Sequence, residues 1–263
     1  MTSTDHTAPR RRLSAGHAHD LGRMGLKELV PAYVTYPTVQ IYAALTLPAG
    51  IGAWRTGAAE RPIGVAVAAV IAFLIYPLVW YGLHRFVLHS RFLYRFPQTA
   101  KLWKRIHFDH HQDPNRLDVL FGSLTNTLPT IAIATLPIGY LIAGWPGALS
   151  ALASGLATTL LYEFCHCIQH LNFLPNNPWL KKIKALHMAH HFHNEQGNYG
   201  IISFWPDKLL KTQYAIREKP RSPTVHNLGY DDAEAARFPW VAAHHAEAKA
   251  RRKAEAEARE MAD

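Results

Sequence analysis

The chain has 263 residues, 49% of them hydrophobic, and a formal net charge of +9. Its mean hydropathy of −0.09 would suit a soluble protein, but this value averages charged segments with long uncharged ones. The uncharged segments favour a membrane protein, in which basic residues mark orientation and contact anionic headgroups. A nucleic-acid partner is therefore not needed to explain the positive charge, and we expect none.

Four apolar stretches follow a polar, basic start that shows no signal-peptide pattern. They lie near 36–54, 62–83, 125–144 and 147–165. A bilayer core is crossed by about 20 apolar residues, so each stretch is expected to be a transmembrane helix. The alternative is a set of buried core helices in a soluble α-protein, although soluble cores seldom need four such uncharged spans.

The last two stretches share one uncharged run, residues 119–162, which is long enough for two crossings. The sequence Ala143-Gly144-Trp145-Pro146-Gly147 supplies a turn between them. We therefore expect a helical hairpin here.

Lys and Arg are unevenly distributed around these spans. There are five in 1–35, seven in 84–118 and fourteen from residue 166 onward, but only two in the first hairpin loop and none in the second. Positive residues favour the cytoplasmic side, so both termini and the 84–118 segment are expected to be cytoplasmic.

The predicted fold is all-α. We expect a polytopic, multi-pass integral membrane protein with about four transmembrane helices and a cytoplasmic helical cap. The sequence divides into a basic cytoplasmic segment (1–35), a membrane domain (36–215) and a charged C-terminal tail (216–263).

Ten histidines in four tight groups are the most informative feature of the chain. The groups are His84 and His89; His107, His110 and His111; His166 and His170; and His187, His190 and His191. Imidazole is a ligand shared by Zn, Cu, Fe and Ni sites, and offsets of three and four lie on one helix face. Each triplet is thus expected to aim its imidazoles at one point.

Ten ligands are too many for one ion, which takes about four to six, so we expect a dinuclear metal centre. All four groups fall just beyond predicted membrane helices on the same side, so they are expected to meet there. An offset of five is about 140° around a helix, so His84 and His89 need a local distortion or different approaches to the metal.

Several neighbouring residues are candidates to support this centre. Asp109 and Glu163 can accept a hydrogen bond from a ligand imidazole or simply face solvent. His193 can coordinate, relay protons or do neither, and Asn194 beside it is a further candidate. Cys165 and Cys167 flank His166 and are expected to pack as small hydrophobic residues rather than to bind metal.

The histidine pattern resembles the fatty acid hydroxylase / sterol desaturase superfamily, over roughly residues 70–215. The segments His190-His191-Phe192-His193-Asn194, Gly197-Asn198-Tyr199-Gly200-Ile201 and Trp205-Pro206-Asp207-Lys208-Leu209-Leu210-Lys211-Thr212 are similar to its C-terminal signature. Lys211 departs from it, because glycine is common at that position. The extra pair, His166 and His170, looks most like the fatty acid 2-hydroxylase branch.

This resemblance implies an oxidoreductase, a membrane-embedded lipid monooxygenase that uses O2 as co-substrate. It carries the ten histidines over as ligands of two metal ions, expected to be Fe, with Zn in the isolated protein as the alternative. The His-Pro-Gly-Gly motif of a fused cytochrome b5 is not found in the sequence. The electron donor is thus expected to be separate, of the cytochrome b5, ferredoxin or reductase type.

Three other functions remain open from the sequence. The same centre could desaturate a lipid, because loss of a second hydrogen competes with oxygen insertion. A metal transporter or storage protein should have ligands inside its membrane spans, which are almost free of them here. A dizinc hydrolase would act without oxygen or reductant.

Overall fold

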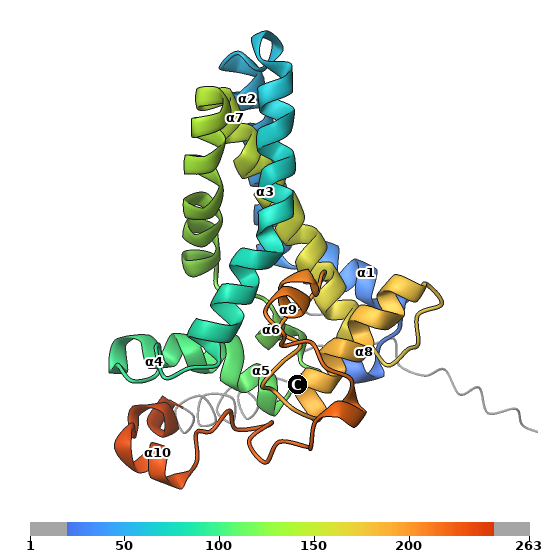
Figure 1. Ribbon diagram of the computed structural model, residues 1–263, viewed down its shortest axis with the longest axis vertical. Coiled ribbons are helices and arrows are strands. Elements are labelled where there is room, and N and C mark those ends of the chain that lie inside the picture. The colour runs from blue at the N-terminus through green and yellow to red at the C-terminus, as the bar shows by residue number, and fades with distance from the viewer. Residues whose placement is uncertain (1–19, 245–263) are drawn as a thin grey trace, which may run out of the picture.

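All four apolar stretches form helix in the computed structural model, which describes residues 20–244. The first two are α2 (Pro37–Arg55) and α3 (Pro62–Leu83). The other two lie in α7 (Leu124–His170). These helices stand together as an upright bundle in which α2 and α3 both pack along α7 (Figure 1). The outer parts of the predicted N-terminal segment and C-terminal tail, 1–19 and 245–263, lie outside the described residues.

Two helical stretches are long and apolar enough to cross a membrane, Pro62–Leu88 and Leu117–His170. The second is a hairpin rather than one straight rod. Non-helical backbone at Ala143 and at Gly144, where φ is +68°, breaks α7 into two halves. A positive φ suits glycine, which has no Cβ to clash. The predicted turn between the third and fourth stretches is confirmed.

Small residues let the bundle helices approach closely. Gly139 and Gly147 face each other across the α7 hairpin, where an added Cβ on either would overlap the other's carbonyl oxygen. Ala68 on α3 packs against Ala151 on α7. Ser154 reaches across from α7 and donates to the carbonyl oxygen of Ala69 at 2.7 Å. Close backbone contact and such hydrogen bonds are the means by which helices associate in an apolar medium.

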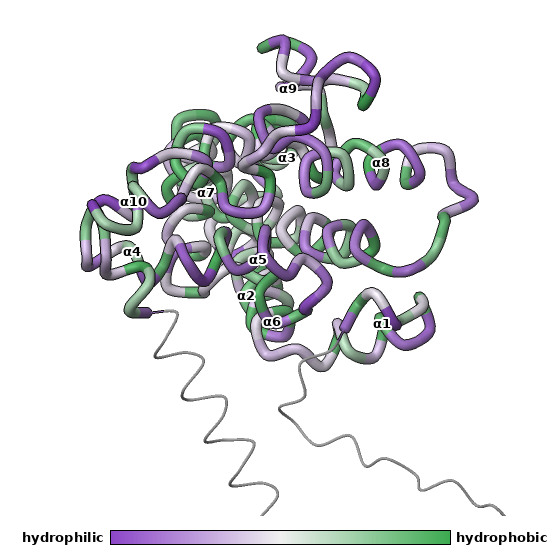
Figure 2. The backbone as a smooth tube through the Cα atoms, turned by 90° about the horizontal axis from the view of Figure 1, so that it is seen from below, coloured by the Kyte–Doolittle hydropathy of each residue, from purple (hydrophilic) through white to green (hydrophobic). Residues whose placement is uncertain are grey.

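The shorter helices, apart from η2, gather at one end of the bundle (Figure 1) and form what we call the cap. Hydrophilic segments are prominent in this part of the chain when it is seen from below (Figure 2). The described residues contain no β-strand, only one isolated bridge between Asp20 and Arg116. The shorter elements are η1 (Leu21–Arg23), α1 (Leu26–Val34), η2 (Ala58–Glu60), η3 (His84–Leu88), α4 (Pro97–Trp103), η4 (Lys104–Phe108), α5 (Asp109–Gln112), α6 (Leu117–Leu120), α8 (Pro178–Phe192), α9 (Trp205–Leu209), η5 (Ile216–Glu218) and α10 (Asp232–Arg237).

The close approach of the two α7 halves predicts an asymmetry between two glycines. Gly139→Ala should lower the thermal unfolding temperature in detergent micelles, because overpacking at this contact costs about 1–3 kcal/mol. Gly50→Ala on α2 is the matched control, since an added Cβ there meets nothing within 4 Å. Equal unfolding temperatures for the two variants would show that the hairpin contact is not tight.

Candidate metal centre

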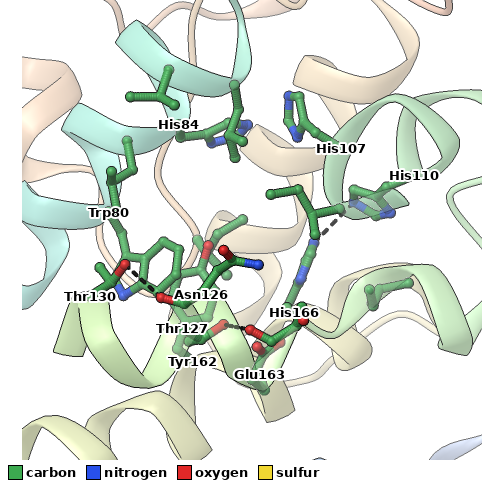
Figure 3. Close-up of a pocket in the computed structure, with 18 of the residues that line it drawn as sticks. Trp80, His84, His107, His110, Asn126, Thr127, Thr130, Tyr162, Glu163 and His166 are labelled. Atoms are coloured by element: carbon green, nitrogen blue, oxygen red, sulfur yellow. Dashed lines mark hydrogen bonds between the residues drawn. The ribbon is translucent and has the colours of Figure 1, made fainter. Parts of the chain in front are cut away.

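Helix ends from the bundle and the cap bring the predicted histidines together. His84 and His89 bracket η3 at the end of α3, whereas His166 and His170 close α7. The two triplets come from η4–α5 and from the last turns of α8. Figure 3 shows His84, His107, His110 and His166 along one side of a cavity. The expectation that all four groups meet is therefore confirmed.

The donor atoms form two groups that could each hold a metal ion, with all atoms of a group within 4.8 Å of one another. We call them the five-histidine group and the four-histidine group. The first contains His110, His166, His170, His187 and His191, and the second contains His84, His89, His111 and His190. His107 belongs to neither group, but its ring centroid lies 4.5 Å from that of His89.

The expectation that each triplet aims at one point is wrong. His110 joins the five-histidine group while its neighbour His111 joins the other. His190 and His191 are divided in the same way, in the opposite order. Consecutive residues on an α-helix are about 100° apart, so a pair of adjacent histidines at the junction of two sites must face both of them.

A π-helical turn resolves the awkward spacing of His84 and His89. In η3 the N–H of His89 donates to the carbonyl of His84 at 3.0 Å, an i→i+5 bond. This wider turn aligns residues five apart, and the two Nε2 atoms approach to 3.2 Å. The local distortion expected from the sequence is confirmed. A second π turn, η4, precedes the first triplet.

The spacing of the nitrogens fits metal coordination. Metal–nitrogen bonds of about 2.0–2.1 Å at angles of roughly 90–110° put two donors on one ion about 2.8–3.4 Å apart. The Nε2 atoms of His166 and His110 are 3.1 Å apart, and those of His170 and His187 are 3.0 Å apart. Two like imidazole nitrogens at such distances, buried from water, are what a shared cation would require.

Burial also keeps the imidazoles in their metal-binding form. Desolvation lowers the pKa of His111 to about 3. It likewise lowers the pKa of the other histidines that lie outside the candidate spans, namely His89, His107, His110, His187, His190 and His191. Neutral imidazole carries the free lone pair that a metal needs. The residues present therefore fit a pair of metal ions.

Backbone carbonyls set the orientation of the four-histidine group. A carbonyl oxygen can only accept, so an imidazole Nδ1 bonded to it must carry the proton, and Nε2 then keeps the lone pair. His84 Nδ1 donates to the carbonyl of Tyr199 at 2.6 Å, and His190 Nδ1 to that of Gly197 at 2.7 Å. No sequence pattern indicates these partners, because every residue has a backbone carbonyl.

Asp207 holds the loop that presents these carbonyls. It is fully buried and accepts from the N–H groups of Tyr199 and Gly200 at 2.8 and 2.9 Å, and from the Thr212 hydroxyl at 2.8 Å. This accounts for an aspartate in the family signature. Lys211 has a φ of +56°, a left-handed conformation that favours glycine, which explains why glycine is common at this position.

The other candidate supporting residues lie in different surroundings. Asp109 forms an ion pair with Lys104 at 2.5 Å, which replaces the expected choice between a ligand histidine and solvent. Glu163 is 4% exposed, and its Oε2 has no hydrogen-bond partner among the described residues. His193 faces the C-terminal segment, with Nε2 2.8 Å from the carbonyl of Lys219, and Asn194 donates to that of Pro220.

Both cysteines are buried and free. Cys165 packs in a cluster with Tyr76 and Ile183, and Cys167 packs in a cluster with Leu29 and Phe121. Neither cysteine belongs to a group of candidate metal ligands. The expectation that they act as small hydrophobic residues is confirmed.

An apolar cavity of about 210 Å³ reaches the histidines from the side of the bundle. Leu88, Leu93, Leu102 and Ile106 form much of one wall. Trp80, Tyr162 and Glu163 line it together with a polar face at the start of α7 that includes Asn126 and Thr130 (Figure 3). Histidines of both groups complete the lining, so a molecule in this cavity would touch the candidate metal centre.

Comparison with known proteins agrees with this geometry. The model of the family described as Fatty acid hydroxylase matches residues 69–212, more than half of the chain. The chain belongs to the fatty acid hydroxylase family. The match covers every histidine of both groups, and the resemblance inferred from the histidine spacing is confirmed.

The relatives of this fatty acid hydroxylase family member include named lipid hydroxylases. Ceramide very long chain fatty acid hydroxylase SCS7 of Saccharomyces cerevisiae is 30% identical over 151 residues, which cover 54% of this chain and 36% of that protein. Dihydroceramide fatty acyl 2-hydroxylase FAH2 of Arabidopsis thaliana is 30% identical over 163 residues, covering 57% and 63%. The chain thus spans less than two thirds of the length of these relatives.

A solved structure supports the fold. It is described as full length scs7p with only the hydroxylase domain visible, and it matches with a TM-score of 0.52 at 22% identity. The match covers 70% of this chain and 69% of the other. Together with the named relatives, the two candidate spans indicate that the chain is associated with a membrane.

The role of Asp207 gives a testable expectation for this hydroxylase family member. Asp207→Ala should weaken Co2+ binding to the metal-free protein about 10- to 100-fold, the usual cost of losing a group that orients metal ligands. Absorption titration with Co2+ measures this. Lys208→Ala on the same short helix is the control, because Lys208 is exposed. Identical titrations for both variants would contradict the role assigned to the loop.

The lowered histidine pKa values give a second expectation, for the metal-free protein. In the unfolded chain these imidazoles take up protons near pH 6.5, whereas in the folded site they resist protonation to about pH 3 at His111. The unfolded state therefore gains protons first as the pH falls below 6.5, and folding stability should decrease from there toward pH 4. Thermal unfolding followed from pH 8 to 4 measures this. A folding stability that does not change over this pH range would show that water enters the metal-free site and solvates its imidazoles.

Proposed function

We propose that this chain is a membrane-bound, O2-dependent monooxygenase that hydroxylates a C–H bond of a fatty acyl or sterol-like lipid. The observation that carries the proposal is the apolar cavity whose lining includes histidines from both candidate metal groups. Named hydroxylases among the relatives support the reaction class. The cavity is smaller than typical pockets for whole ligands, which are about 300–1,000 Å³, so only part of a lipid would enter it.

In this proposal the ten histidines hold two metal ions, with Fe as the expected metal. His107 completes the set from its place beside the four-histidine group, where its Nε2 has no hydrogen-bond partner among the described residues. Bound redox-active ions would supply the binding and reduction of O2. An all-imidazole ligand set adds no negative charge, so the centre would stay strongly electrophilic.

The overall reaction balances with an external reductant. One C–H bond becomes C–OH with one atom of O2, and the other oxygen atom leaves as water after uptake of two electrons and two protons. The electrons come from a separate donor of the cytochrome b5, ferredoxin or reductase type. The proposed substrates are the lipid and O2, and the donor protein supplies the reducing electrons.

The residues of the cavity would position the lipid and exclude water. Leucine and isoleucine side chains from η3, α4 and η4 offer an apolar wall for an acyl segment. Trp80 and Tyr162 stack with ring centroids 5.3 Å apart, forming a flat surface beside the histidines. Glu163 is buried, and its Oε2 has no hydrogen-bond partner in the described part of the chain, so it would bond a polar group of the substrate or a water near it.

We further propose that α2, α3 and the two halves of α7 are four membrane spans and that the cap is cytoplasmic. The concentration of Lys and Arg in the cap segments supports this orientation. The cavity would then open at the level where the spans end, and an acyl chain would reach the histidines without leaving the bilayer.

Growth under 18O2 tests the function directly. Lipids from cells with the intact chain should include a species heavier by one labelled oxygen. That species should be lost when both candidate metal groups are damaged in the His110→Ala His190→Ala variant. Mass spectrometry of total lipids is the measurement, with cells without the chain as background. A species lighter by two hydrogens would indicate a desaturase instead, and no lipid change at all would contradict lipid oxidation.

A further inference from the structure

The chain beyond the family match wraps across the cap. The match ends at residue 212, but residues 219–241, which we call the C-terminal strap, make extensive contacts with the candidate metal centre and with the cavity wall. In both ribbon and tube views α10 lies beside α4, far from α10 in the sequence (Figures 1 and 2).

The first part of the strap is fastened to the end of α8. The Ser222 N–H donates to the His193 carbonyl at 2.8 Å, and the His193 ring nitrogen Nε2 lies 2.8 Å from the Lys219 carbonyl. Asn194 donates to the Pro220 carbonyl at 3.0 Å. The residues that directly follow the second histidine triplet therefore bind the strap.

This anchor brings a strap carbonyl to a candidate ligand. Val225 is 2% exposed, and its carbonyl oxygen accepts from His111 Nδ1 at 3.2 Å. His111 belongs to the four-histidine group, and its Nε2 is buried with no partner among the described residues. The strap thus orients His111 through a backbone carbonyl, as the loop held by Asp207 orients His84 and His190.

The second part of the strap is fastened to the segment before α4. Glu234 on α10 accepts from Arg91 at 2.6 Å and from the Tyr94 hydroxyl at 2.8 Å. Burial and this hydrogen bond raise the pKa of Tyr94 to about 12, so its hydroxyl stays a donor. Trp240 donates from Nε1 to the Tyr94 carbonyl at 2.7 Å. Tyr94 is therefore held through both its side chain and its backbone.

Tyr94 leads directly to the cavity wall. Its ring packs on Trp103 with centroids 4.6 Å apart, and Trp103 donates from Nε1 to the Leu88 carbonyl at 2.7 Å. Leu88 lines the cavity and precedes His89 in the chain. Leu93, another cavity residue, is packed against the same aromatic cluster.

We propose that the C-terminal strap is part of the catalytic unit, in which Glu234 is a positioning residue for the lipid cavity wall and the His193 anchor positions the carbonyl that orients His111. The strap then controls two properties separately. Its α10 end sets how well the acyl segment fits, and its first part sets how well the four-histidine group binds metal. The substrate half of this statement rests on the proposed lipid hydroxylase function.

Glu234→Ala in the full chain tests the α10 end, with Asp232→Ala as the control on the same helix because Asp232 is exposed. The iron-loaded enzyme is assayed with palmitoyl ceramide in mixed micelles and reduced methyl viologen as electron donor. Glu234→Ala should raise KM between about 2-fold and 30-fold with kcat unchanged, the range for a displaced packed network. Glu234→Gln keeps an acceptor for Tyr94 and should restore part of the loss.

His193→Ala tests the first part of the strap, with Arg221→Ala as the control because Arg221 is exposed. Co2+ affinity of the metal-free protein should fall about 10-fold in His193→Ala, as for other lost orienting contacts, and should stay unchanged in Arg221→Ala. Hydrogen–deuterium exchange gives a readout independent of turnover. It should rise in residues 84–108 for Glu234→Ala and not for Asp232→Ala.

The outcomes separate the strap from the hydroxylase function. An unchanged KM in Glu234→Ala, or a KM, kcat and Co2+ spectrum that all deteriorate together, overturns the positioning role. Unchanged Co2+ affinity in His193→Ala overturns the metal half. If the unaltered chain shows no turnover, the proposed function fails in this assay. Hydrogen–deuterium exchange and Co2+ affinity then test the role of the strap by the same criteria.

Discussion

The structure depends on a cluster of ten imidazoles, nine of them buried and that of His89 half-buried, with many of their lone pairs pointing at one another. Without a cation, such pairs as His170 and His187 at 3.0 Å are at best one weak hydrogen bond, and several ring nitrogens have no partner among the described residues. Leaving buried polar groups unpaired costs about 1–3 kcal/mol each. The rest of the cap can be understood as the framework that keeps this unfavourable cluster assembled.

That framework relies on the backbone more than on side chains. The carbonyls of Gly197, Tyr199 and Val225 each accept a hydrogen bond from the Nδ1 of a different histidine. A backbone carbonyl is a precise partner only if its loop is fixed, and the loops here are fixed by buried groups. Asp207 serves the first two carbonyls, whereas the strap serves the third. The orientation of the candidate ligands thus depends on how the loops are packed, at each of the three carbonyls.

Much of this could be predicted from the sequence, where the signal was a period or a composition. The long uncharged stretches predicted the helices, and the turn residues Ala143–Gly147 predicted the hairpin. The offset of five between His84 and His89 predicted a local distortion, which is a π turn in the structure. Sequence could not assign the partner of Asp109, because Lys104 reaches it only through a second π turn. Nor could it show the strap, because its contacts with Tyr94 and His111 join residues more than 100 positions apart.

The division of each triplet between two groups has a mechanical consequence. His110 and His111 share one short helix, and His190 and His191 share another, so rotating either helix to improve one group moves a donor of the other. On the proposed ligand assignment, the first ion to bind would fix both helices and leave less freedom to be lost when the second binds. The two sites would then fill together rather than independently, and the Val225 carbonyl, which orients His111 alone, would still influence both. A spacing that serves a single site better, with no adjacent histidines, would lose this coupling.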